Sequence, residues 1–308
     1  MKNLTIQSFY RFLEISNKIQ IKKDLDSYFK CRVIRGTILL ADEGINATIS
    51  GDDKTIEQAI RFIKKQLKIK KLDIKKSKTN FLPFNRMKVR LKKEIVSLGV
   101  GNFKSKSLKG KYIHPSCWDE IILDKDIKVV DVRNMYEINI GKFNKSINPF
   151  TNTFREFPNK IDNLSLSKKD KIAMYCTGGI RCEKASAYLK NKGYKNIYQL
   201  EGGIINYLHY TMHTNKSSQW KGNCFVFDDR VAINNKLNKS NYLQCYGCRR
   251  PITRKDTLSK FYKKGVTCPY CYNERSTKQK MSSITRQNQI EEAEKSNRSH
   301  SFRKITND

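Results

Sequence analysis

One short segment carries the residue types that a nucleophilic enzyme needs. It reads YCTGGIRCEKA at 175–185, and Cys176 follows an apolar run. The pattern predicts a buried strand that ends at Cys176, a tight loop, and a helix that begins near Arg181. Gly178 and Gly179 allow the loop to turn sharply and to direct several backbone N–H groups toward one point. The expected active-site loop comprises Cys176, Thr177, Gly178, Gly179, Ile180 and Arg181.

Three features of this loop favour an anion at its centre. The backbone N–H groups converge, Arg181 adds a positive charge, and the following helix presents its positive N-terminal end. Together they are expected to lower the pKa of the Cys176 thiol and to keep it as a thiolate. A lone cysteine at a strand end is usually a small buried hydrophobe, but the C-x4-R spacing with two glycines favours a nucleophile.

Three further segments surround the loop: VVDVRNMYE at 129–137, GKFNKSINP at 141–149 and LEGGIINY at 200–207. With CTGGIRC they resemble the rhodanese family. The resemblance implies a doubly wound parallel sheet over about 113–215, with the cysteine loop at the carboxyl edge of the strands, where α/β proteins bind ligands.

Other side chains near the loop are candidates for supporting roles. Asp131 and Arg133 are expected to brace the active-site side of the sheet rather than to take part in chemistry. Cys182 lies next to the loop, and two interpretations stay open for it. Its thiol could resolve an oxidised Cys176, or it could be a first-turn helix residue turned toward the core.

A second cysteine pattern lies toward the C-terminus. Two C-x2-C pairs are separated by 19 residues, which is the spacing of a four-thiolate zinc ribbon. About thirty residues cannot supply a stable core alone, so a structural zinc ion is favoured over a redox dithiol pair. The expected module spans 241–275, after a connector at 216–240, and its ligands are Cys245, Cys248, Cys268 and Cys271.

The first third of the chain reads as a separate α+β domain. Its alternating and helical patterns follow a βαββαβ order, which predicts a ferredoxin-like domain over 1–112. No known catalytic constellation appears in it. In the segment ADEGINATISG, Glu43 and Asn46 are expected to organise the turn between two strands.

Composition restricts the class of protein. The 308-residue chain has a formal net charge of +33, which creates a strong field for polyanions such as nucleic acid. Part of this charge is expected to be compositional drift, since Lys, Asn and Ile are all abundant. No apolar run approaches the ~18 residues of a membrane span, and the N-terminus lacks a signal-peptide cleavage site. We therefore expect a cytoplasmic protein without membrane contact, with a basic, partly disordered tail over 276–308.

The combination of these parts narrows the family. The chain resembles the bacterial tRNA uridine hydroxylase family in three parts. These are ADEGINA in an N-terminal ferredoxin-like domain, YCTGGIRCEKASAYL in a rhodanese-like domain, and a cysteine-bearing C-terminus. The resemblance covers roughly 5–275 and implies oxygen-dependent 5-hydroxylation of the wobble uridine in the tRNA anticodon loop. It also implies that Cys176 is the catalytic, persulfide-forming residue. The expected zinc site is based on the spacing of the C-x2-C pairs and not on the resemblance to this family.

The reaction itself leaves alternatives open. Cys176 could add to C6 of the pyrimidine, or it could carry sulfur or oxygen as a persulfide or sulfenate. No flavin, haem or 2-His-1-carboxylate signature appears, and no protein partner is evident. A rhodanese-type sulfurtransferase is the alternative enzyme, and a non-catalytic zinc-ribbon RNA-binding protein is the alternative outside enzymes.

Overall fold

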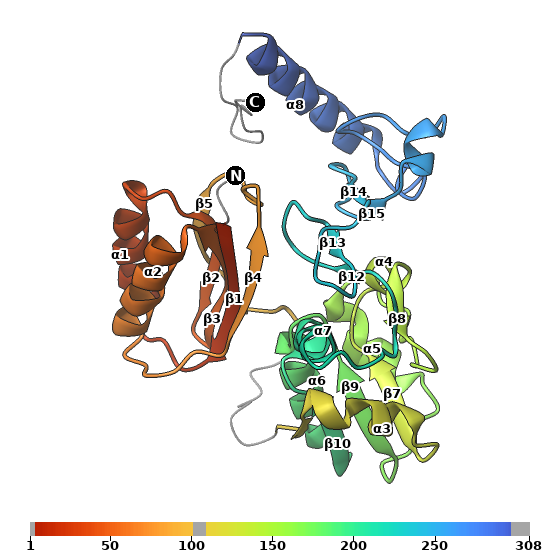
Figure 1. Ribbon diagram of the computed structural model, residues 1–308. Coiled ribbons are helices and arrows are strands. Elements are labelled where there is room, and N and C mark those ends of the chain that lie inside the picture. Colours follow the sequence, from red (N-terminus) through yellow and green to blue (C-terminus); the bar gives the residue numbers. More distant parts are fainter. Residues whose placement is uncertain (1–3, 101–108, 297–308) are drawn as a thin grey trace.

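The computed structural model describes residues 4–100 and 109–296. An N-terminal domain lies beside a central domain, and a small C-terminal module carrying a long helix lies above the central domain in the view of Figure 1. Three parts of our expectations fall outside the described residues: 1–3 and 101–108, which belong to the expected N-terminal domain, and the end of the tail at 297–308.

The N-terminal domain is an antiparallel sheet with a fifth strand added in parallel. Its strand order, β4-β1-β3-β2-β5, confirms the ferredoxin-like α+β prediction, and the edge strand β5 pairs parallel with β2. The elements are β1 (Leu4–Phe12), α1 (Lys18–Lys30), β2 (Arg35–Ala41), β3 (Gly44–Gly51), α2 (Asp53–Gln66), β4 (Ile74–Thr79) and β5 (Met87–Leu91).

Alternation along the strands gives this sheet two different faces. Ile45, Ala47 and Ile49 of β3 are buried in the core that α1 and α2 cover. Asn46 and Thr48 point the other way and line a cleft toward the central domain. Both helices lie on the far side of the sheet from the central domain (Figure 1). The sheet therefore presents a face without helices to the rest of the molecule.

The central domain is built on a four-stranded, all-parallel sheet with the order β6-β10-β9-β7. Residues of α5 and α6 fill the core on one face, and residues of α3 and α7 fill the other, which confirms the doubly wound prediction. The elements are β6 (Lys111–Ile113), η1 (Pro115–Cys117), α3 (Trp118–Leu123), β7 (Ile127–Asp131), α4 (Met135–Ile138), β8 (Gly141–Phe143), η2 (Phe154–Glu156), α5 (Phe157–Asp162), β9 (Lys171–Tyr175), α6 (Ile180–Asn191), β10 (Asn196–Leu200) and α7 (Gly203–His213).

The segment expected to be a connector belongs to the central domain instead. Trp220 and Cys224 are buried in the core beneath α3 and α7. Removing apolar side chains from water stabilises the fold more than leaving them exposed in a linker would. The strands here are β11 (Trp220–Gly222), which pairs with β8, and the hairpin of β12 (Cys224–Phe225) and β13 (Ala232–Ile233).

The C-terminal module contains a hairpin, β14 (Leu243–Gln244) and β15 (Pro251–Ile252), and η3 (Lys255–Leu258). The segment from 276 on was expected to be a partly disordered tail, but it begins with the helix α8 (Thr277–Lys295). Ser276 and Gln279 form a capping box at the N-terminus of this helix. Arg286 fixes this helix to the module by donating to the carbonyl oxygens of Tyr246 and Gly265. Among the described residues, no helix combines the length and apolar character needed to cross a membrane.

Candidate active site and metal centre

The cysteine loop lies where the parallel sheet meets the N-terminus of α6. Cys176 directly follows β9, and the backbone N–H of Gly179 donates to its Sγ at 3.1 Å. Gly179 has a φ of +97°, in the left-handed region that favours glycine, and α6 begins at the next residue. The strand–loop–helix geometry predicted from CTGGIR is therefore present.

The surroundings of Cys176 favour the thiolate. Burial alone would raise its pKa, but the thiol of Cys182, the Arg181 guanidinium, and the backbone N–H groups of Cys182 and Arg181 together lower it to about 5. Burial and the neighbouring thiolate raise the pKa of Cys182 well above its ordinary value. Cys182 thus stays protonated beside Cys176 and donates a hydrogen bond to it.

Arg181 differs from its expected role because its charge is shared with a carboxylate. Its guanidinium forms two hydrogen bonds with Glu137, at 2.5 and 2.7 Å, and both side chains are almost completely buried. Our sequence reasoning gave Glu137 no role, although it lies within the VVDVRNMYE segment. Thr177 also donates to Glu137, at 3.1 Å, so this carboxylate holds both the beginning and the end of the loop.

Asp131 and Arg133 form a buried pair away from the cleft. Their ionic contact is 2.6 Å, and both are fully buried. Arg133 also donates to the backbone carbonyls of Glu137 and Gly141. The pair thereby fixes the segment from which Glu137 reaches the cysteine loop, and neither member lines the cleft.

The LEGGIINY segment supports the loop from the other side. The backbone N–H groups of Ile204 and Ile205, in the first turn of α7, donate to the carbonyl oxygens of Cys176 and Thr177 at 3.0 and 3.1 Å. A Cβ at Gly203 would come within 2.4 Å of the Cys176 carbonyl oxygen. Only glycine allows this close approach.

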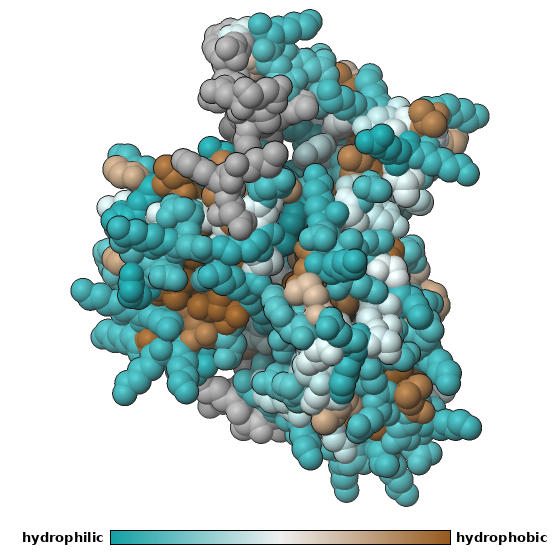
Figure 2. Space-filling model, in the orientation of Figure 1, coloured by the Kyte–Doolittle hydropathy of each residue, from teal (hydrophilic) through white to brown (hydrophobic). Residues whose placement is uncertain are grey.

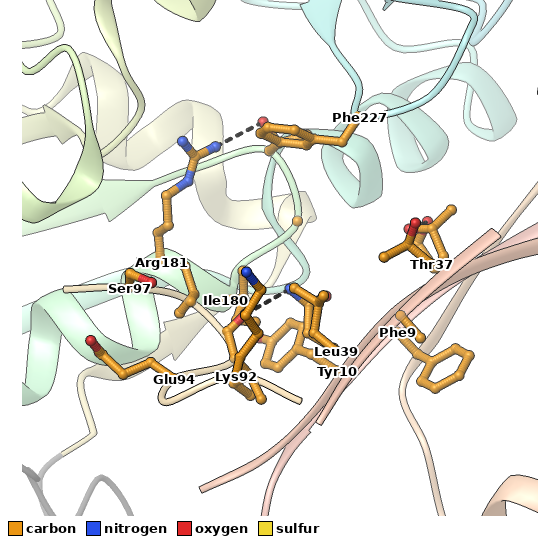
Figure 3. A pocket seen from close by; sticks show the side chains of 18 of the residues that line it. Phe9, Tyr10, Thr37, Leu39, Lys92, Glu94, Ser97, Ile180, Arg181 and Phe227 are labelled. Carbon is orange, nitrogen blue, oxygen red and sulfur yellow. Dashed lines mark hydrogen bonds between the residues drawn. The ribbon is translucent and has the colours of Figure 1, made fainter. Parts of the chain in front are cut away.

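The loop opens toward a large cleft between the N-terminal and central domains. The cleft has a volume of about 2010 Å³, and Cys176, Gly178 and Arg181 form part of its lining. The opposite wall is the sheet face without helices, from which Tyr10, Thr37 and Leu39 project toward the loop (Figure 3). This volume exceeds that of ordinary small-molecule pockets.

Tyr10 covers the cysteine loop, a feature that our sequence reasoning missed. Its hydroxyl lies 2.9 Å from where a Cβ on Gly179 would be, and it donates to Glu183 of α6 at 3.3 Å. Cys176 has no exposed surface. The Cys176 thiol therefore lies beneath the surface of the cleft, and a substrate reaches it only after neighbouring groups move.

Ion pairs join the two domains next to the cleft. Lys184 of α6, itself mostly buried, contacts the carboxylates of Glu43 and Glu94. Glu43 also accepts from the Ile95 backbone N–H at 2.7 Å, and Asn46 donates to the Ile95 carbonyl at 3.0 Å. Glu43 and Asn46 thus hold a distant segment rather than their own turn, because both side chains face the cleft.

The four C-terminal cysteines converge as a metal site requires. Their sulfur atoms all lie within 4.8 Å of one another, and three of the separations are 3.7–3.9 Å. Zn–S bonds of about 2.3 Å in a tetrahedron place sulfurs about 3.8 Å apart. The donor set therefore fits zinc.

Two family models match the chain. A model described as a UPF0176 acylphosphatase-like domain matches residues 4–95, and a rhodanese-like domain model matches residues 116–209. Among solved structures, a rhodanese-like domain from Anabaena sp. is 16% identical, with 36% of this chain and 78% of that chain covered and a TM-score of 0.31. A rhodanese-related protein from Thermoplasma volcanium is 27% identical, with coverages of 32% and 92% and a TM-score of 0.27. At these TM-scores the two structures carry no weight.

A curated relative covers far more of the chain. The tRNA uridine(34) hydroxylase of Wolbachia pipientis wMel is 45% identical over 269 residues, which span 87% of this chain and 96% of that protein. A match over 269 of the 308 residues necessarily includes the cysteine loop. The chain therefore belongs to the tRNA uridine(34) hydroxylase family.

Proposed function

We propose that this protein hydroxylates C5 of the wobble uridine, position 34, in the anticodon loop of tRNA, with Cys176 as the catalytic residue. The observation that carries the proposal is a thiolate-stabilising loop at the floor of a wide interdomain cleft, in a chain whose 45%-identical relative bears that activity in its name. The net reaction replaces C5–H by C5–OH. It consumes one O₂, two electrons from a reductant and two protons, and it releases one water.

The site chemistry supports a pyrimidine substrate. A thiolate is a strong nucleophile, and a pKa of about 5 keeps Cys176 in that form at neutral pH. C6 of uracil accepts nucleophiles because the C4 carbonyl withdraws electrons through the C5–C6 double bond. An anticodon base is unpaired, so placing it in a pocket avoids most of the few kcal/mol that extrusion from a duplex requires.

The surface supports a tRNA partner. Hydrophilic side chains dominate the visible face of all three parts (Figure 2), and the net charge of +33 favours phosphates. The C-terminal module adds exposed aromatic rings beside cations: Arg249 lies 5.2 Å from the Tyr246 ring centroid, and Lys280 lies 4.2 Å from that of Tyr272. Aromatic and cationic side chains together suit unpaired RNA. The proposed substrate would place the protein in the cytoplasm, and the proposal requires no protein partner.

The test is nucleoside mass spectrometry of tRNA from cells with and without this gene, followed by complementation. Wild-type protein and the control Cys31→Ser, which alters an exposed cysteine of the N-terminal domain, should restore an added oxygen at uridine 34. Cys176→Ser should not, because a hydroxyl stays protonated in the same loop. Restoration by Cys176→Ser would remove the cysteine from the mechanism.

A sulfurtransferase is the second candidate, favoured by the six-residue loop with its low-pKa thiol. In that case the Cys176 thiolate of the purified protein would take the outer sulfur of thiosulfate as a persulfide and release sulfite, and cyanide would then remove this sulfur as thiocyanate. The tRNA from the deletion strain would be unchanged. Hydroxylation in cells without thiocyanate formation would favour the first proposal. If the protein formed neither hydroxylated uridine nor thiocyanate, only the RNA-binding role would remain.

A further inference from the structure

Lys75 is the feature of the cleft that the proposed function leaves unexplained. It lies on β4 between Ile74, which packs on the N-terminal core, and Lys76. Side chains alternate along a strand, so Lys75 points into the cleft with Cys176, whereas Lys76 and Lys78 point away and pair with Asp53. The half-buried Lys75 thus brings a positive charge to the wall opposite the cysteine loop.

Lys75 makes no ion pair with a carboxylate among residues 4–100 and 109–296. The Lys75 ammonium lies over the ring of Tyr10, 5.2 Å from the ring centroid. The hydroxyl end of that ring lies against Gly179 of the cysteine loop. An aromatic ring therefore lies between the Lys75 ammonium and the loop that holds Cys176.

The other cations of the cleft are neutralised or solvated. Arg181 and Arg230 pair with the buried carboxylates of Glu137 and Asp228. Lys92, Lys93 and Arg155 also line the cleft but are exposed to solvent, where water screens their charge. Lys75 is the partly buried cation that lines this cleft without a carboxylate partner in the described ranges.

Thiolate addition to uracil needs such a cation. When Sγ forms a bond to C6, the electron pair of the C5–C6 double bond moves toward C4, and negative charge develops on O4. A positive group in a cleft shielded from water stabilises developing charge of this kind. The reverse step expels the thiolate and restores the double bond, so addition requires no oxidant.

We propose that Lys75 is a second catalytic residue, which receives the negative charge that forms on the uracil when the Cys176 thiolate adds to C6. This proposal rests on the proposed function. The uracil would take the place of the Tyr10 ring between the Lys75 ammonium and the cysteine loop, since both are flat rings of similar size. The groups that face Lys75 suit this role. Burial lowers the pKa of Lys75, whereas the charges of Cys176, Asp73 and Glu183 raise it. Tyr10 stays protonated, because burial raises the pKa of its hydroxyl.

The addition step can be followed without oxygen. While the Sγ–C6 bond exists, C5 takes up a solvent proton, and loss of the other C5 hydrogen with expulsion of the thiolate regenerates uridine. Purified protein and tRNA in D₂O, with oxygen excluded, should therefore exchange C5–H for deuterium at position 34, read as a one-dalton mass increase of that nucleoside. Cys176→Ser should abolish the exchange.

Lys75→Met and Lys75→Gln test the cation, and Lys76→Met is the matched control. Both positions lie on β4 and each substitution removes one positive charge, but Lys76 lies on the opposite face. We expect Lys75→Met and Lys75→Gln to slow exchange and hydroxylation on the order of 100-fold, while tRNA affinity matches that of Lys76→Met. Thermal unfolding curves equal to that of the control would confirm that the variants fold.

The pH dependence separates direct action from an effect through Cys176. Removing the Lys75 charge raises the thiol pKa somewhat, and that effect disappears at about pH 8, where the thiol is ionised in every variant. A loss that persists there supports the proposal, and full recovery there would overturn it. Wild-type hydroxylation without any C5 exchange would also overturn it and leave the proposed function intact. Absence of hydroxylation by wild-type protein would refute the proposed function itself.

Discussion

Replacing Glu137 by Gln should destabilise the protein severely, although the two side chains have nearly the same shape. Glu137 is fully buried, and both of its oxygens accept hydrogen bonds from Arg181. A neutral amide leaves the Arg181 charge inside the protein without its carboxylate. Breaking a buried ion pair in this way costs about 3–5 kcal/mol, which corresponds to a fall in melting temperature of about 6–20 °C.

The assay is thermal and urea unfolding of Glu137→Gln beside Glu120→Gln, an exposed glutamate of the same domain. The control should unfold like the wild type. A double variant, Glu137→Gln with Arg181→Met, should recover much of the loss, because it removes the unpaired charge together with its partner.

The thiol gives a second measurement on the same variant. Without the carboxylate, the Arg181 charge acts more strongly on Cys176, so the thiol pKa of Glu137→Gln should fall below about 5. A loss of stability under about 1 kcal/mol, or a double variant less stable than Glu137→Gln, would refute the interpretation of this pair as the support of the loop.

Four further outcomes are expected. The alkylation rate of Cys176 should rise with pH around a midpoint of about 5, and Arg181→Met should move that midpoint upward; an unchanged midpoint would remove Arg181 as a cause. The low pKa of Cys176 in the folded protein adds to the free energy of unfolding, and this contribution is complete above the unfolded thiol pKa of about 8.5. It is lost as the pH falls through about 5. Unfolding of the wild type and of Cys176→Ser over this pH range would measure it. Elemental analysis should find about one zinc per chain, and finding no metal with four freely titratable thiols would exclude the ribbon formed by Cys245, Cys248, Cys268 and Cys271. Affinity for tRNA should fall steeply with salt, with a slope that indicates about four to eight phosphate contacts, whereas a flat response would mean that the positive charge does not serve RNA binding.

The local geometry of this protein could be predicted from its sequence. The strand, the two glycines, Cys176 and the start of α6 are neighbours along the chain, so their geometry follows from backbone rules. The same holds for each C-x2-C knuckle, and the ferredoxin-like order follows from the periodicity of consecutive elements. Tertiary packing overrode the prediction at 216–240, where Trp220 and Cys224 complete the central core.

The surroundings of the thiol were decided by tertiary structure alone. Glu137 comes about forty residues before the loop that it holds, and Tyr10 and Lys75 come from a different domain. Sequence spacing carries no information about such pairs, because each contact depends on which face of a strand or helix is turned toward a distant element. The sequence by itself therefore determined the loop that holds Cys176. Packing within the central domain and against the N-terminal domain decided which charges surround this cysteine, since electrostatic effects depend on distance in space.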